Sequence, residues 1–144
     1  MVIPMVYDMQ LNDDPFKKIQ QGSKDIELRL YDEKRRRLDI NDIIIFTNIT
    51  DANQQLAVVI SALYRYPSFE ALFFDFSPER CGFAPGTNIM IASQQMQQYY
   101  SMEKTDALGV LGIRFKVADL KQALYQKERQ NERRINLLFP DGLK

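Results

Sequence analysis

Residues 41–66, NDIIIFTNITDANQQLAVVISALYRY, contain two long apolar segments separated by a short polar stretch. The first segment, IIIFTNI at 43–49, is too apolar for a half-exposed strand, which predicts a central strand of a sheet. Asp-Ala-Asn then indicates a turn, and the second segment, QLAVVISALYRY at 55–66, is long enough to pair with the first as a hairpin. Asn41 and Asp42 predict another turn before the hairpin, because Asn tolerates a positive φ.

A third strand is predicted upstream of the hairpin. The stretch DIELRLYD at 25–32 alternates apolar and polar residues, which is the period of a strand with one buried face. Ile26 and the two leucines that follow it are expected to face the core. The opposite face then presents Glu27 and Arg29 side by side, roughly 7 Å apart along the strand.

The N-terminal segment predicts a strand over 3–11 and a short helix over 14–21. Asn12 is a suitable N-cap for this helix, and a proline at position 15 suits its first turn. Gly22 is a suitable C-cap, because glycine readily adopts the left-handed conformation in which many helices end. This part of the chain therefore adds one strand and one helix before the third strand.

Downstream, Pro67 ends the long strand and Ser68 predicts the cap of a helix. The phenylalanines of this region are expected in the core: Phe69, Phe73, Phe74 and Phe76. A second helix is predicted over 88–100, with an apolar side formed by Ile89, Met90, Met96, Tyr99 and Tyr100.

The chain then predicts a last strand, GVLGIRFKV, over 109–117. Asp119 caps a C-terminal helix over 120–134, which has a thin apolar stripe, and a tail ending in PDGLK follows. Long hairpin strands with helices inserted between them favour an antiparallel or mixed sheet over a doubly wound parallel one. The fold class predicted from these patterns is α+β, with the strands curling into a small barrel.

Composition is typical of one globular domain. The 144 residues are 45% hydrophobic and 26% charged, and 19 Lys and Arg balance 19 Asp and Glu. No apolar run approaches the roughly 20 residues of a membrane span, so no membrane partner is expected. The N-terminus lacks the basic start and apolar stretch of a signal peptide, which predicts a cytoplasmic location.

Missing residue types narrow the chemistry. The chain has no histidine, which excludes Ser-His-Asp triads, Cys-His pairs and histidine-ligated metals. Cys81 is the only cysteine, so the chain has no internal disulfide and no thiolate zinc cluster. Carboxylate pairs at 13–14 and at 39 and 42 have the chemistry of Mg²⁺ ligands, but cap and turn roles already explain them. No metal and no cofactor is predicted.

Several blocks of the sequence together resemble the ASCH domain family over residues 9–116. They are Pro15-Phe16 with Ile19, GSKDIELR at 22–29, DEKR at 32–35, YRYPSFEAL at 64–72, and YSME at 100–103 followed by GVLGI at 109–113. The pattern G-x-K-x-I-E-x-R is the most specific of them. The expected organisation is an ASCH-like domain over 1–117 and a C-terminal helical extension and tail over 118–144.

The resemblance implies a PUA-like fold, a pseudo-barrel of five or six strands with helices packed at its ends. It also implies a cleft between barrel and helix that takes RNA or modified nucleotides and is lined by Lys24, Glu27 and Arg29. Some members of the family resemble enzymes, among them a small amidohydrolase acting on N4-acetylated cytidine and a proposed ribonuclease. RNA, a nucleotide or a modified nucleoside is therefore the expected partner, and the oligomeric state stays open.

Three positions depart from the family pattern. Asn41-Asp42 stands where Gly-Asp is usual, and Leu108 replaces an aromatic residue before the Gly-Val step. More seriously, the amidohydrolase has a nucleophilic threonine three residues after its lysine, and that position is Glu27 here. Lys24 is retained without the hydroxyl, so that activity does not carry over directly.

Side-chain chemistry suggests roles for the candidate residues. Lys24 and Arg29 suit a phosphate, and Glu27 suits a base amino group or a general-base role. The alternative for these three is an ordinary ion pair on a solvated strand face. Further candidate ligand-binding residues come from the basic run, the tyrosines and a cap serine: Lys34, Arg35, Tyr66, Ser68 and Tyr100.

Purely structural roles are alternatives for these candidates as well. The basic run at 34–37 suits an RNA backbone or a solvated turn, and Lys34 or Arg35 is also positioned in sequence to pair with Glu27. The tyrosines suit base stacking or the rim of the core, and Ser68 suits helix capping.

Three functions remain from the sequence. The first is an RNA- or nucleotide-binding module, and the second is a histidine-free hydrolase in which Lys24 and Glu27 are the catalytic pair. The third is an interaction module for a peptide or metabolite.

Overall fold

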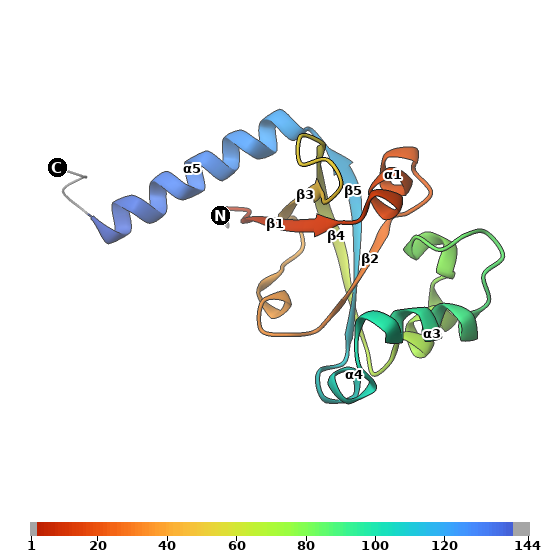
Figure 1. Cartoon of the computed structure of the whole chain (residues 1–144). Coiled ribbons are helices and arrows are strands. Elements are labelled where there is room, and N and C mark those ends of the chain that lie inside the picture. The colour runs from red at the N-terminus through yellow and green to blue at the C-terminus, as the bar shows by residue number, and fades with distance from the viewer. Residues whose placement is uncertain (1–2, 140–144) are drawn as a thin grey trace.

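The computed structural model describes residues 3–139 as a curled five-stranded sheet surrounded by helices (Figure 1). The elements follow in the order β1 (Val6–Leu11), α1 (Asp13–Gln21), β2 (Ile26–Leu30), η1 (Arg35–Arg37), β3 (Ile43–Asn48), β4 (Gln55–Tyr66), α2 (Phe69–Asp75), η2 (Pro78–Cys81), α3 (Ile89–Tyr99), α4 (Met102–Leu108), β5 (Val110–Ala118) and α5 (Leu120–Leu138).

The sheet is mixed, one of the two arrangements that the sequence favoured. Its strand order is β1-β3-β4-β5-β2, with β1 parallel to β3 and every other pair antiparallel. The β3–β4 hairpin lies inside the sheet, and β3 is almost wholly buried. Asn41 precedes it with a φ of 76°, which confirms the turn that its side chain tolerates. The two edge strands of the sheet are therefore β1 and β2, which are the first two strands in sequence.

The inner face of the curled sheet holds one apolar cluster. Phe46 of β3 and Phe115 of β5 pack edge to face there, with ring centroids 6.0 Å apart. Phe16 and Ile19 of α1 complete this cluster and are almost fully buried, so α1 closes one end of the half-barrel. The helix ends at Gly22, whose φ of 86° is the predicted left-handed C-cap.

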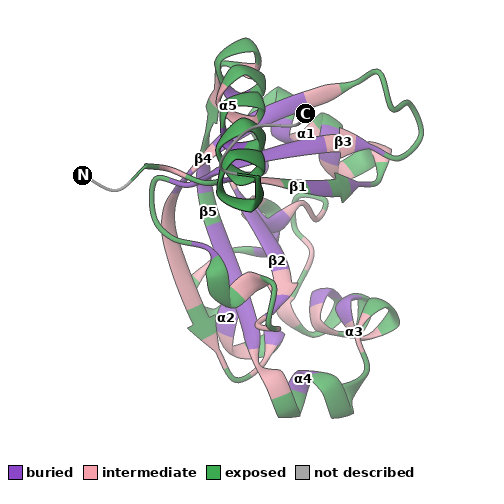
Figure 2. Cartoon of the chain, turned by 90° about the vertical axis from the view of Figure 1, so that its left-hand side faces the viewer, coloured by how far each residue is buried: buried purple, intermediate pink, exposed green. Residues whose placement is uncertain are grey.

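Two further clusters lie on the outer face. One forms between β2, β5 and the helices α2 and α3, and includes Ile26, Leu72 and Met96. The other lies under α5, where Ala123 packs on Ile43 and its strand neighbours. Figure 2 shows the result, with buried central strands and a largely exposed α5 that extends away from the sheet (Figures 1 and 2).

Some local predictions were wrong. The first strand begins at Val6 rather than residue 3, helix α4 was not predicted, and α5 continues four residues beyond 134, to Leu138. Phe74 and Met90 were expected in apolar faces but are each 71% exposed, because α2 and α3 turn those positions away from the sheet. The predicted tail ending in PDGLK lies outside the described residues.

The most consequential correction concerns β2. The alternation was right, since Ile26 and both leucines contact the outer cluster. The opposite face is not solvated, however. Glu27 stands opposite Ile113 and Arg29 opposite Leu111, so both side chains are on the inner face of the sheet, where Glu27 is only 5% exposed.

Candidate functional site

A cleft of about 590 Å³ lies where the edge of the sheet meets the helices α1 and α3. Its floor comes from β2 and the residues just before it, one wall from α1, and the opposite wall from η2, the loop after it and α3. This volume falls within the range of ligand pockets in proteins, about 300–1,000 Å³. The segments around it are far apart in sequence and meet only in the folded chain.

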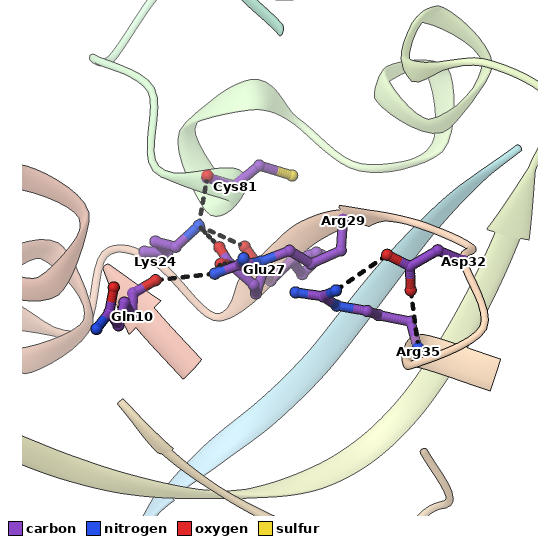
Figure 3. A network of polar contacts seen from close by, with 8 residues as sticks. Gln10, Lys24, Glu27, Arg29, Asp32, Arg35 and Cys81 are labelled. Carbon is purple, nitrogen blue, oxygen red and sulfur yellow. Dashed lines mark hydrogen bonds and ion pairs between the residues drawn. The ribbon is translucent and has the colours of Figure 1, made fainter. Parts of the chain in front are cut away.

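A network of buried charges forms the floor of the cleft (Figure 3). One carboxylate oxygen of Glu27 lies 2.9 Å from Nζ of Lys24. The other oxygen accepts from Nε of Arg29 at 2.9 Å and from Nη2 at 2.8 Å. The two cations therefore hold the carboxylate in a fixed orientation from both sides.

Lys24 is bonded on every donor of its ammonium group. Besides Glu27, its Nζ donates to the carbonyl of Ile26 at 2.9 Å and to the carbonyl of Cys81 at 2.8 Å. The residue is 4% exposed. A Cβ at Gly82, which has a φ of 103°, would lie 3.0 Å from Cδ of Lys24, so a glycine there lets η2 approach the lysine closely.

Arg29 connects the two edges of the sheet. While it holds Glu27 on its own strand, its Nη2 also donates to the main-chain carbonyl of Gln10 in β1 at 3.0 Å (Figure 3). Its side chain remains 18% exposed at the cleft. Of the three floor residues, Arg29 thus has the most exposed side chain.

The electrostatics of the floor keep Glu27 ionised. Burial works against the charged carboxylate, but the charges and hydrogen bonds of Lys24 and Arg29 outweigh it and lower the pKa of Glu27. Burial raises the pKa of the neighbouring Cys81 thiol to about 12. The thiol is therefore protonated at neutral pH and is not a nucleophile.

Two tyrosines at the end of α3 line the cleft. Tyr100 is half-buried, stacks on Phe69 with ring centroids 5.8 Å apart, and has a pKa raised by burial. Tyr99 is 69% exposed and keeps its ring open to solvent. The cleft thus combines a charged floor with an exposed aromatic ring at its rim.

The ASCH domain model matches residues 9–133 of the sequence. The chain belongs to the ASCH domain family. The match begins in β1 and ends within α5, so it includes the whole cleft and most of the C-terminal helix. The expected boundary between an ASCH domain and an extension, at 117, stays a prediction.

Solved structures agree with this assignment. The crystal structure of the hypothetical protein PH0355 is 31% identical, covers 79% of this chain and 100% of its own, and superposes with a TM-score of 0.70. Protein PF0455 from Pyrococcus furiosus is 30% identical over 80% of this chain and 99% of its own, with a TM-score of 0.64. The sequence has no significant match among curated proteins.

A more distant structure shares the fold alone. A mutant form of the protein ZmASCH from Zymomonas mobilis is 16% identical over 78% of this chain and 66% of its own, with a TM-score of 0.50. The mixed sheet with helices at its ends is accordingly the PUA-like half-barrel that the sequence resemblance implied.

Two predicted site residues of this ASCH domain lie apart from the cleft. Tyr66 donates its hydroxyl to a carboxylate oxygen of Asp75, which raises its pKa to about 12. Ser68 accepts from the amide of Ala71 and caps α2, and it borders a different pocket between α2, α3 and α4. Neither residue is among those that line the cleft.

The basic run is also used differently from one of its predicted roles. Arg35 bonds Asp32 at 3.0 Å through Nη1, instead of pairing with Glu27 (Figure 3). Lys34 is exposed and borders a separate pocket of about 310 Å³ beside β1. The pairing with Glu27 was wrong because Lys24 and Arg29 already occupy both carboxylate oxygens.

Sequence reasoning missed the walls of the cleft. Lys18 of α1 donates to the carbonyl of Gly82 at 2.7 Å and pairs with Asp14 at 2.9 Å, which connects the two walls. Gln95 and Gln98 of α3 face the cleft, and the glutamine-rich patch at 94–98 was the only signal that pointed to them. Which residues of a helix face a cleft depends on the surface on which the helix docks. A local sequence pattern does not determine that surface.

Two other classes of site are missing from residues 3–139. No group of three or more His, Cys, Asp or Glu side chains there is arranged to hold a metal ion. Within the same range no helix has the length and apolar character needed to cross a membrane. Asp42, one of the carboxylates considered for Mg²⁺, accepts from the amides of Met5 and Asp39 and so stabilises a turn.

Proposed function

We propose that this ASCH domain binds single-stranded RNA and holds one nucleotide in the cleft. The observation that carries the proposal is the buried Lys24–Glu27–Arg29 network on the cleft floor. Removing three charged groups from water is costly, and such networks often stabilise a fold less than apolar residues of the same size would. Placed at the floor of an open cleft, the network is better explained by recognition of a polar ligand.

Each part of the cleft has a role in this proposal. Arg29 supplies the positive charge, because Glu27 fixes its orientation and its side chain is the most exposed of the three floor residues. Tyr99 offers an exposed ring on which a base stacks. Gln95 and Gln98 offer amide donors and acceptors for base edges. The ASCH family is itself generally proposed to bind RNA, which supports the same class of ligand.

The hydrolase alternative has less support. A general base works best with a pKa near the working pH, and the lowered pKa of Glu27 makes it a weak base. Both of its oxygens are already paired, and every donor of Lys24 is bonded. RNA binding without turnover is therefore the favoured function of this floor.

The test is a binding titration with end-labelled single-stranded RNA at several salt concentrations, read by fluorescence anisotropy. Tyr99→Ala is expected to weaken binding by roughly 1–3 kcal/mol through the loss of one stacked base. Arg29→Gln is expected to weaken binding and to lower the salt slope by about 0.7, the value for one lost phosphate contact on a single strand. Tyr125→Ala, at an exposed tyrosine of α5 outside the cleft, is the matched control.

A denaturing gel of the same samples separates the alternatives. Intact RNA with the expected losses supports the binding module. Shortened RNA that stays intact with Glu27→Gln protein would instead establish the hydrolase. If no RNA binds or shortens, the interaction module for a peptide or metabolite becomes the leading function.

A further inference from the structure

Two arginines stack on Tyr31, the residue that follows β2. The guanidinium carbon of Arg65 is 4.0 Å from the ring centroid of Tyr31, and that of Arg36 is 5.3 Å from it. Tyr31 is half-buried and packs against the inner apolar cluster, whereas both arginines are exposed. We name this group the Tyr31 cluster: Tyr31, Arg36 and Arg65.

The guanidinium groups of this cluster have free hydrogen-bonding edges. Within the described part of the chain, neither Arg36 nor Arg65 has an ion-pair or side-chain hydrogen-bond partner. Stacking on a ring occupies the face of a guanidinium and leaves the N–H groups along its edge available. Held in this way, the two arginines suit an anion with several acceptor oxygens, and the chemistry best matched is a phosphate.

The cluster is related to the cleft by the register of the sheet. Arg29 and Arg65 both stand opposite Leu111, on β2 and β4 respectively, so the three residues form one row across the inner face of the sheet. Two strand spacings separate Arg29 from Arg65, about 10 Å between their backbones. A short stretch of nucleic acid can therefore contact the cleft and the cluster together.

Arg35 lies along the same route. In sequence it stands between Arg29 of the cleft and Arg36 of the cluster. Nη1 of Arg35 bonds Asp32, but its Nε is buried without a hydrogen-bond partner (Figure 3). A buried donor left unpaired is costly, and a shift of the Arg35 side chain toward an incoming phosphate oxygen would satisfy it.

We infer that the Tyr31 cluster binds a phosphate of an RNA strand that extends beyond the nucleotide in the cleft. The inference rests on the proposed function and sharpens it. The ligand is an oligonucleotide rather than a free nucleoside, and its backbone runs from Arg29 to Arg36 and Arg65.

The experiment compares RNA length. A nucleoside monophosphate, as a competitor, and single-stranded RNAs of increasing length are titrated against native protein and against Arg36→Gln/Arg65→Gln protein over a salt series. Native protein is expected to bind the longer RNAs several-fold more tightly than the mononucleotide. The double variant is expected to lose this gain, and its salt slope should fall by about 0.7 per arginine.

Controls separate a local effect from a folding defect. Arg114→Gln removes an exposed arginine on the other face of β5 and should leave every affinity unchanged. Mononucleotide affinity should be equal in native and double-variant protein, which also shows that the cleft is intact. Tyr31→Leu keeps an apolar side chain but removes the stacking surface, and it is expected to lower affinity for long RNA alone.

The outcomes distinguish the two ideas. Suppose that RNA binds, and that the affinity of the double variant rises with RNA length and falls with salt as it does for native protein. The Tyr31 cluster is then not a phosphate site, and the cleft proposal stands. If mononucleotide and long RNA bind native protein equally, the inference also fails. Absence of binding at every length overturns the proposed function, and the inference with it.

Discussion

Among residues 3–139, Glu27 is the only carboxylate paired with the two cations on the floor of the cleft. Lys24 is buried beside it and Arg29 is mostly buried, and each lies within 2.9 Å of one of its carboxylate oxygens. Deleting the charge while keeping the shape would leave both cations in a poorly solvated place. The consequence for stability is therefore larger than for a surface ion pair.

At this residue scale, Glu27→Gln is expected to lower the free energy of unfolding by about 3–5 kcal/mol at neutral pH, the usual cost of breaking a buried pair from one side. Urea denaturation followed by circular dichroism measures it. Glu128→Gln, at an exposed position of α5, is the control and should change stability by less than about 0.5 kcal/mol. An equally small change at Glu27 would contradict the buried network.

The same residue predicts how stability depends on pH. Because folding lowers the pKa of Glu27 below its ordinary value of 4.5, its ionised form stabilises the folded state above that value. This stabilisation is lost as the pH falls from 4.5 through the lower pKa of the folded protein. The difference in unfolding free energy between native and Glu27→Gln protein should thus be constant well above pH 4.5. It should shrink as the pH falls from 4.5 through the pKa of Glu27 in the folded protein. A difference independent of pH in denaturation series across this range would count against the mechanism.

Sequence alone located these residues but not their surroundings. The alternation from Ile26 to Leu30 correctly separated the two faces of β2, since that separation depends only on local geometry. It could not reveal that Glu27 would be buried, because burial depends on how α1, η2 and α3 close over it from distant parts of the chain. The alternative interpretation, an ion pair on a solvated strand face, was wrong for that reason.

At the scale of elements, α5 protects the free edge of the sheet. The amide of Val6 donates to Oε1 of Gln130 at 2.8 Å, and Nε2 of Gln130 donates back to the carbonyl of Val6 at 3.0 Å. β1 is an edge strand, and such unpaired main-chain groups are a template for unwanted pairing with other chains. One glutamine side chain satisfies both groups.

Gln130→Ala is therefore expected to destabilise the protein by about 1–3 kcal/mol, the cost of unsatisfied buried polar groups. Hydrogen exchange of the Val6 amide should become faster, which NMR or mass spectrometry can follow. Gln122→Ala, on an exposed turn of the same helix, controls for helix propensity. Unchanged protection of Val6 would show that this side chain does not hold the edge.

Helix positions were predicted better than helix faces. Ser68 and Asp119, two of the predicted N-caps, each accept a main-chain hydrogen bond at the start of a helix, because cap preference is a local property. Asn12 also precedes its helix as predicted, but its side chain makes no capping hydrogen bond. The exposure of Phe74 and Met90 was missed, since the face of a short helix that becomes buried is set by the partner on which it docks.

For the whole molecule, α5 is packed on the sheet as part of one body. It covers the outer cluster of Val6, Ile43, Ile45 and Ala57 with its Ala123, and Lys127 pairs with Asp8 of β1 at 2.8 Å. Removing residues 119–144 is expected to lower the unfolding free energy by on the order of 3–5 kcal/mol, through newly exposed apolar surface and the freed edge.

Thermal denaturation and size-exclusion chromatography would measure this effect, with a chain ending at Phe139 as the control. A lower melting temperature and a tendency to associate are expected for the shorter chain. A truncated protein as stable and monodisperse as the control would instead support a self-contained domain that ends near 117.

The contact from Arg29 to the carbonyl of Gln10 has a thermodynamic consequence for ligand binding. Its Nη2 closes the gap between the first and last strands of the half-barrel, and the same guanidinium faces the cleft. A ligand that competes for this group competes with closure of the barrel. Occupancy and strand separation are then linked, and the coupling free energy is the same in both directions. Ligand binding would change the equilibrium between paired and separated edges by some factor. Separation of the edges would change the affinity for ligand by the same factor.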